Sequence, residues 1–136
     1  MPDSVQDYRW LALRWDAEHR CVYSEWKGFA NSVELRSGMI KIIDVIRDHH
    51  AGSFVSDNRK LEVVTNEDQL WIRDTWTPLA VGAGLKRIAV VLASRGLGKL
   101  ASEAVLSQIG KTAFATRTFA TVSEAIAWTV AEQSKD

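Results

Sequence analysis

The sequence predicts a single domain of the α/β class, a sandwich in which helices pack against a mostly parallel sheet. Two segments with strand character come first, and helix and strand segments then alternate along the rest of the chain. Such alternation is typical of parallel strands, because the chain crosses back over the sheet through a helix between one strand and the next. The length of 136 residues fits one domain, 1–136. The predicted order is β-β-α-β-α-β-α-β-α, with about five strands at 8–15, 20–27, 52–57, 86–94 and 112–119 and four main helices at 32–48, 66–76, 98–109 and 122–133.

The strand predictions rest on runs of apolar and aromatic residues. The first two runs are joined by a polar turn at 16–19, which predicts an antiparallel hairpin. The continuous apolar run 88–93 is typical of a central strand that is buried on both faces. The segment 112–119, rich in Thr and Phe, has the character of an edge strand, and such an edge needs cover. A homodimer that covers this edge with a second copy is therefore left open.

The helix predictions rest on capping signals followed by apolar residues at three- and four-residue spacing. In each signal an Asn or Thr stands three residues before an acidic residue, as in a capping box. The pairs are Asn31 with Glu34, Thr65 with Asp68, and Thr121 with Glu124. The helix 66–76 is expected to be short, because Pro78 cannot lie inside it. Pro78 is instead expected to begin a further turn, with Thr77 as its cap.

Charge, hydropathy and cysteine content argue against several classes of protein. The chain carries 17 basic and 17 acidic residues, whereas nucleic-acid binders usually carry a clear basic excess. No apolar run approaches the ~20 residues that cross a bilayer, so no stable membrane insertion is expected. The sequence begins without the basic and apolar regions of a signal peptide. Together with a single cysteine, Cys21, which excludes an internal disulfide, this pattern predicts a cytoplasmic protein.

Five segments spread from Tyr8 to Trp128 carry a resemblance to a known family. They are the opening hairpin that ends in Trp26-Lys27-Gly28, the strand and turn FVSDNR, the segment EDQLWIRDTW, the strand KRIAVVLAS, and the closing EAIAW. In these aromatic and apolar patterns the chain resembles the SpoIIAA-like, STAS-type small bacterial proteins. The resemblance implies a sheet of about five strands with helices packed against it. Members of this subgroup are largely of unknown function, and better-known relatives act by docking partner proteins, notably anti-sigma factors.

The chain departs from the phospho-regulated members of that family at one position. In those relatives an Asp-Ser pair opens a helix directly after the third strand, and the serine is phosphorylated. Here the equivalent pair is Asp57-Asn58, and the next helix begins only after residues 61–64. Asn58 cannot be phosphorylated, and Ser56 precedes the aspartate and does not match the family's serine. We therefore do not carry the phosphorylation switch over to this chain.

Two strand ends carry the residues that the sequence singles out for binding. In open α/β sheets, ligands bind beyond the carboxyl ends of the parallel strands. The residues at these two ends are Asp57, Asn58 and Arg59, and then Arg95, Gly96, Gly98 and Lys99. A strand followed by glycines and a helix can offer free backbone N–H groups to an anion. The short G-x-G-K sequence is not a P-loop, so a tight loop with solvated cations is the alternative.

No catalytic, metal or cofactor site is predicted. Asp57 and Asp74 are isolated carboxylates, and a single carboxylate at a strand end is more often a turn former than an acid or base. His49 and His50 are adjacent on a helix, so their side chains point about 100° apart and make a poor metal pair. His19 stands in a turn without the spaced cysteines or carboxylates of a zinc site.

Three functional hypotheses remain. The first is a non-enzymatic regulatory module that binds a protein partner through the strand-end residues and an aromatic patch formed by Trp71 and Trp76. The alternative is a binding protein for a small apolar or anionic ligand, lipid-like or nucleotide-like. That ligand would lie between the helix 66–76 and the sheet, in a pocket lined by Trp71, Trp76 and Leu79. An enzyme with an unrecognised site is the third hypothesis. The six tryptophans are otherwise expected in the core, because each ring can bury a large area.

Overall fold

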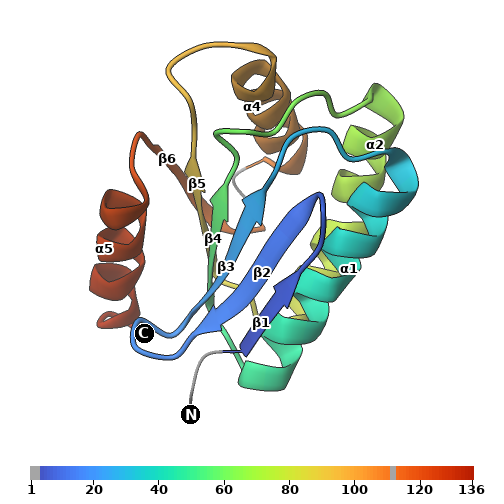
Figure 1. Cartoon of the computed structure of the whole chain (residues 1–136). Coiled ribbons are helices and arrows are strands. Elements are labelled where there is room, and N and C mark those ends of the chain that lie inside the picture. The colour runs from blue at the N-terminus through green and yellow to red at the C-terminus, as the bar shows by residue number, and fades with distance from the viewer. Residues whose placement is uncertain (1–3, 111–112) are drawn as a thin grey trace.

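The structure is a mixed six-stranded sheet with helices on both faces (Figure 1). It is a computed structural model that describes residues 4–110 and 113–136. The strands lie side by side in sequence order: β1 (Ser4–Asp7), β2 (Leu11–Asp16), β3 (Cys21–Trp26), β4 (Ser53–Asp57), β5 (Arg87–Val91) and β6 (Ala115–Phe119). The first three strands pair antiparallel, and β3 to β6 pair parallel. The predicted α/β class with a mostly parallel sheet is confirmed.

The edges of the sheet differ from the prediction. A sixth strand, β1, pairs antiparallel with β2. The predicted strand 8–15 begins only at Leu11, because Tyr8 and Leu11 close a turn through backbone bonds of 2.7 and 3.4 Å. At the other edge β6 begins at Ala115, and position 112 of the predicted strand lies outside the described residues.

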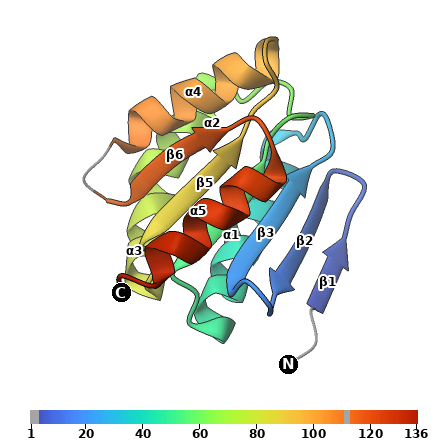
Figure 2. The ribbon, with the colours of Figure 1, turned by 90° about the vertical axis from the view of Figure 1, so that its left-hand side faces the viewer.

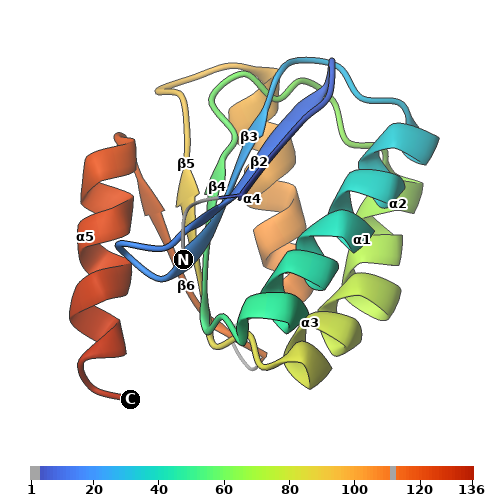
Figure 3. The same cartoon turned by 60° about the horizontal axis from the view of Figure 1, so that its bottom comes forward.

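The helices divide unevenly between the two faces of the sheet. One face is covered by α1 (Ser32–His49), α2 (Asn66–Trp71), the π-helical turn η1 (Ile72–Trp76), α3 (Thr77–Ala83) and α4 (Leu97–Ile109). The other face is covered by α5 (Val122–Gln133) alone (Figure 2 and Figure 3). Crossovers between parallel strands are right-handed, so strands added one after another in one direction place every crossover helix on the same face. Because α5 follows the last strand, that constraint does not apply to it.

The predicted capping residues begin the helices as expected. Asn31 accepts a hydrogen bond from the backbone N–H of Glu34 at 2.9 Å, and the Glu34 side chain bonds back to Asn31. Thr65 and Thr121 each accept a hydrogen bond from the backbone N–H three residues later. The cap therefore fixes the first residue of α1, α2 and α5, and these helices begin at or next to the predicted position.

The predicted helix 66–76 coincides with α2 and η1, and Pro78 stands in the first turn of α3 as expected, but the expected break between them is absent because the chain stays helical from Asn66 to Ala83. The N–H of Thr77 bonds to the carbonyl of Ile72, five residues back, so the hydrogen-bond register shifts by one residue directly before the proline. Thr77 does not act as a cap either. It has helical backbone angles, and its hydroxyl donates to the same carbonyl at 2.9 Å.

The two faces bury cores of different size. The larger core lies between the sheet and α1 to α4, and the smaller one lies under α5. β5 is buried along its whole length, as the apolar run 88–93 predicts. β6, at one edge of the sheet, is more exposed than β5. Among the described residues, no helix combines the length and the apolar character needed to cross a membrane.

Candidate functional site

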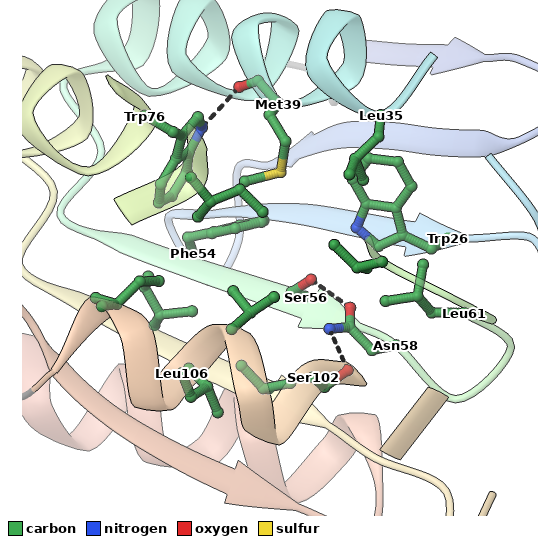
Figure 4. Close-up of a pocket in the computed structure, with 16 residues that line it drawn as sticks. Trp26, Leu35, Met39, Phe54, Ser56, Asn58, Leu61, Trp76, Ser102 and Leu106 are labelled. Atoms are coloured by element: carbon green, nitrogen blue, oxygen red, sulfur yellow. Dashed lines mark hydrogen bonds between the residues drawn. The ribbon is translucent and has the colours of Figure 1, made fainter. Parts of the chain in front are cut away.

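An interior cavity lies between the sheet and the helices of the larger core (Figure 4). Its volume is about 60 Å³. At roughly 10–15 Å³ for each water-sized position, this space admits about four to six non-hydrogen atoms. The apolar part of the wall comes from β3, α1, β4, the β4–α2 loop, η1, β5 and α4. It consists mainly of Trp26, Leu35, Met39, Phe54, Leu61, Ile72, Trp76, Ile88, Leu106 and Ile109. An apolar wall with a few convergent polar groups is the usual form of a small-molecule site.

Three polar side chains line this apolar space near the end of β4. Ser56 Oγ donates to Asn58 Oδ1 at 2.6 Å, and Asn58 Nδ2 donates to Ser102 Oγ at 3.0 Å (Figure 4). Both serines are buried. Among residues 4–110 and 113–136, the Ser102 hydroxyl accepts this hydrogen bond and donates none. Its proton is therefore available to an acceptor atom inside the cavity. We call these three residues the polar trio.

The sheet and α4 position the polar trio. Successive side chains of a strand point to opposite faces of the sheet, so Ser56 faces α1 to α4 and Asp57 points to the face that α5 covers. The backbone N–H of Asn58 bonds to the carbonyl of Val91 at 2.9 Å, which continues the β4–β5 ladder by one residue. On α4, positions three and four residues apart share a face, and Ser102 therefore lies in line with Leu106.

Trp76 forms the far wall of the cavity. It is 1% exposed, and its indole Nε1 donates to the carbonyl of Met39 on α1 at 2.8 Å (Figure 4). Its ring lies 6.2 Å from those of Phe54 and Phe114, measured between centroids. The ring is carried by the π-helical turn η1, a type of turn that is frequent at functional sites.

Asp57 and Arg59 form an ion pair on the opposite side of the sheet from Asn58. The guanidinium donates to both carboxylate oxygens, from Nε at 2.9 Å and from Nη2 at 2.7 Å, and the Tyr23 hydroxyl donates at 3.3 Å. Burial raises the pKa of Asp57, but the hydrogen bonds and charge of Arg59 outweigh it and lower the pKa below its ordinary value. Burial, helped by the Asp57 charge, raises the pKa of Tyr23 to about 12. A carboxylate held ionised and paired in this way is suited to a structural ion pair rather than to proton transfer.

A shallow groove at the carboxyl edge of the sheet brings Arg59 close to Lys99. Ser94 and Phe119 also line this groove. The Lys99 ammonium donates to the carbonyl of Ser94 at 3.5 Å, and the guanidinium of Arg59 is committed to its carboxylate partner. The groove is open to solvent, and both of its cations already have partners in the chain.

The loop before α4 holds the remaining predicted residues. Gly96 has φ +112° and stands at the start of α4, and Arg95 is exposed. Gly98 is buried, and its backbone packs directly against the carbonyl of Leu61 in the β4–α2 loop. The two glycines thus have separate roles: Gly96 allows the turn, and Gly98 allows two backbone segments to approach closely.

The structure separates the residues that the sequence grouped into one binding surface. Asn58 and Trp76 line the interior cavity, whereas Arg59 and Lys99 line the outer groove. Trp71 belongs to neither place. It is half-buried, and its ring lies 5.3 Å from the Arg36 guanidinium.

The pocket suggested between helix 66–76 and the sheet exists, but its lining differs from the expectation. Trp76 lines it, while Trp71 does not and Leu79 is 40% exposed on α3. Neither Ser56 nor Ser102 was predicted from the sequence as a site residue. A signal for Ser102 was present, because a polar residue stood within the inward-facing apolar stripe of its helix.

Neither a metal cluster nor a relative helps to define the chemistry of this site. Within the described parts of the chain, no three His, Cys, Asp or Glu residues gather closely enough to hold a metal ion. Comparison with protein-family models, curated proteins and solved structures finds no match to this chain. Its function is therefore inferred from the residues and their geometry.

Proposed function

We propose that this protein binds a small, mostly apolar molecule that carries one hydrogen-bond acceptor. The observation that supports this most directly is the interior cavity, which is apolar except for the polar trio at the end of β4. The apolar wall would hold the hydrocarbon part of the ligand. The Ser102 hydroxyl would donate to its polar end.

Burying the polar trio costs free energy that a site serving only to pack the core would not need to spend. A buried hydroxyl or amide must be hydrogen-bonded to offset the loss of water, and apolar residues of similar shape can replace such a network with little loss of stability. Here the polar trio is extended by Ser24 on β3, whose hydroxyl donates to Ser56 Oγ at 3.4 Å, and the Ser102 hydroxyl donates to no partner in the described chain. A ligand acceptor would complete it.

Titration with n-butanol tests the proposal, because its five non-hydrogen atoms match the space in the cavity and its hydroxyl can accept from Ser102. The probe would be followed through the amide signals of Asn58 in NMR spectra. We expect saturable shifts at Asn58, and about tenfold weaker binding after Ser102→Ala, the loss of one hydrogen bond.

A matched pair of substitutions on α4 separates the cavity from the protein surface. Leu106 lines the cavity, whereas Leu100 on the same helix is 64% exposed. Leu106→Phe should fill the cavity and abolish the shifts at Asn58, and Leu100→Phe should leave them unchanged. Shifts that are linear in alcohol concentration, or that survive Leu106→Phe, would exclude the cavity as the binding site.

We retain a second proposal, that the protein is a regulatory, protein-interaction module of the SpoIIAA-like, STAS type, without the phosphorylation switch. Two observations favour it: the sequential order of the parallel strands with their crossover helices on one face, and apolar side chains exposed at the carboxyl edge. The exposed side chains are Phe29, Val33, Val63, Leu97 and Leu100.

Photo-crosslinking tests this second proposal. A photoreactive residue in place of Val63 should capture one defined protein in the source cell, and Leu97→Ser with Leu100→Ser should abolish that product. The same probe in place of Val81, which is 48% exposed on α3, serves as the control. Equal products from both positions would contradict a specific docking edge, and a product made of two copies of this chain would point to the homodimer instead.

A further inference from the structure

A second pocket lies at the opposite edge of the sheet from the polar trio, where the parallel strands begin. It measures about 350 Å³. Its wall is formed by the turns that lead into β3, β4 and β5, the first residue of β5, and the end of α5 with Asp136. This edge is the lower one in Figure 1, close to the C-terminal label. None of the residues in the interior cavity belongs to it.

The wall of this pocket is strongly cationic. Arg20, Lys86 and Arg87 line it together with His50, and the single carboxylate in the wall is that of Asp136. The whole chain has a net charge of +0, so this concentration of positive charge is local. A concave site lined by one sign of charge attracts ions of the opposite sign.

Arg87 is the buried centre of the cluster. Its side chain is 6% exposed, and its guanidinium donates to Ser53 Oγ at 2.8 Å and to Asp136 Oδ1 at 2.5 Å. The Lys86 ammonium lies 3.8 Å from the other oxygen of Asp136. The carboxylate of Asp136 is therefore held by two cations, as an oxyanion from solution would be.

The backbone supports a role for the side chains of this pocket. Among the described residues, the two non-glycine residues with positive φ are Arg20, at +53°, and His50, at +51°. Both line the pocket. Glycine adopts such angles without strain, yet the chain places a cation and an imidazole there. Glycine is also the usual residue at the left-handed C-cap of a helix, which is the position that His50 takes at the end of α1.

The position of Asp136 allows its carboxylate to move out of the pocket. It lies outside α5, and its backbone N–H bonds only to the carbonyl of Gln133 at 3.1 Å. A change in the backbone angles of Lys135 and Asp136, which breaks their hydrogen bonds to the carbonyls of Glu132 and Gln133, would withdraw the carboxylate from Arg87. Lys86 and Arg87 would then face an open pocket, with His50 and Arg20 also in its wall and the Arg20 guanidinium 5.8 Å from the Trp15 ring. Two cations suit a doubly charged anion better than a single carboxylate does.

We propose that this pocket binds the phosphate group of a small molecule or inorganic phosphate, and that Asp136 occupies the site as an internal substitute when phosphate is absent. The site is independent of the function proposed for the interior cavity. Because the carboxylate competes with the ligand, its removal raises the apparent affinity of the pocket.

The test compares the wild type with Asp136→Asn, which keeps the shape of the side chain and removes its charge. Inorganic phosphate would be titrated at low millimolar concentration against sodium chloride of equal ionic strength, since phosphate at high concentration stabilises proteins in general. Binding would be followed through the amide signals of Gly52 and Gly84, which line the pocket. This measurement is made on the folded protein, so a loss of stability in the variant does not obscure it.

We expect Asp136→Asn to bind phosphate at least about tenfold more tightly than the wild type. In that background Lys86→Ala should weaken binding several-fold, and Lys99→Ala, a similar change at the opposite edge, should not. Equal affinity of the wild type and Asp136→Asn would overturn the proposal. Signal shifts that sodium chloride reproduces would also overturn it, and so would equal effects of the two lysine variants. In each of these cases the Asp136 ion pairs would serve only to hold the end of α5 against the sheet.

Discussion

Gly98→Ala tests how closely α4 must approach the β4–α2 loop. An ideal Cβ at position 98 would lie 1.8 Å from the carbonyl oxygen of Leu61 and 2.9 Å from its carbon. Ordinary contact begins at about 3.4 Å, so the two backbone segments would have to separate by more than an ångström. Overpacking of this kind typically costs ~1–3 kcal/mol, and both partners here are backbone, so we expect a loss of about 2–3 kcal/mol in the free energy of unfolding. Alanine's better helix propensity, worth up to ~1 kcal/mol, offsets part of the cost.

Gly82 provides the matched control for that substitution. It lies in α3 without positive φ, and a Cβ added there meets no atom within 4 Å. Gly82→Ala should therefore stabilise the protein by about 0.5–1 kcal/mol. Urea unfolding followed by tryptophan fluorescence measures both variants. If Gly98→Ala is as stable as the wild type, or changes stability in the same direction as Gly82→Ala, the close approach does not exist in solution.

Three further substitutions test the wall of the cavity and one ion pair. Trp76→Phe removes the hydrogen bond to Met39 and should cost about 1–2 kcal/mol in urea unfolding; an unchanged midpoint would show that this bond is not made. Asn58→Ala breaks a buried network and should cost about 1–3 kcal/mol while leaving the secondary structure unchanged by circular dichroism; a neutral effect would contradict the network. The hydrogen bond from His19 to Asp16 raises the pKa of His19 in the folded protein. The pair therefore stabilises the fold fully below the ordinary histidine pKa of about 6.5, and this contribution is lost as pH rises through the raised pKa of the folded state. His19→Gln should therefore lower the urea midpoint at about pH 5.5 and have little effect at about pH 8.5, with a change of no more than ~1 kcal/mol because His19 is partly exposed; equal effects at both pH values would contradict this pairing.

The parts of the fold that local signals determine could be predicted from the sequence. The helices α1 and α5 begin at the predicted residues, because a capping side chain fixes the first turn within three residues of sequence. β1 could not be predicted in the same way. Its sequence contains one apolar residue, Val5, and its conformation depends on pairing with β2. The continuation of the helix past Pro78 also lay beyond local rules, since it needs the register shift of η1.

The candidate site was predicted in part. The sequence singled out Asn58 and Trp76, and both line the cavity. It grouped Asn58 with Asp57 and Arg59 because these three residues follow one strand end, but the alternation of side chains sends the Asp57–Arg59 ion pair to the opposite face of the sheet. Ser102 required a further step, since only the three-dimensional structure shows which residue of α4 meets the end of β4.

The most direct test of the interior cavity as the binding site is to measure nuclear Overhauser contacts between bound n-butanol and the methyl groups of the protein. If the interior cavity is the binding site, the alcohol's methyl group should show contacts to Leu106 and Ile109, which line that cavity. Contacts confined to Leu97 and Leu100, which are 66% and 64% exposed on the outside of α4, would contradict it and show that the alcohol binds only to the surface.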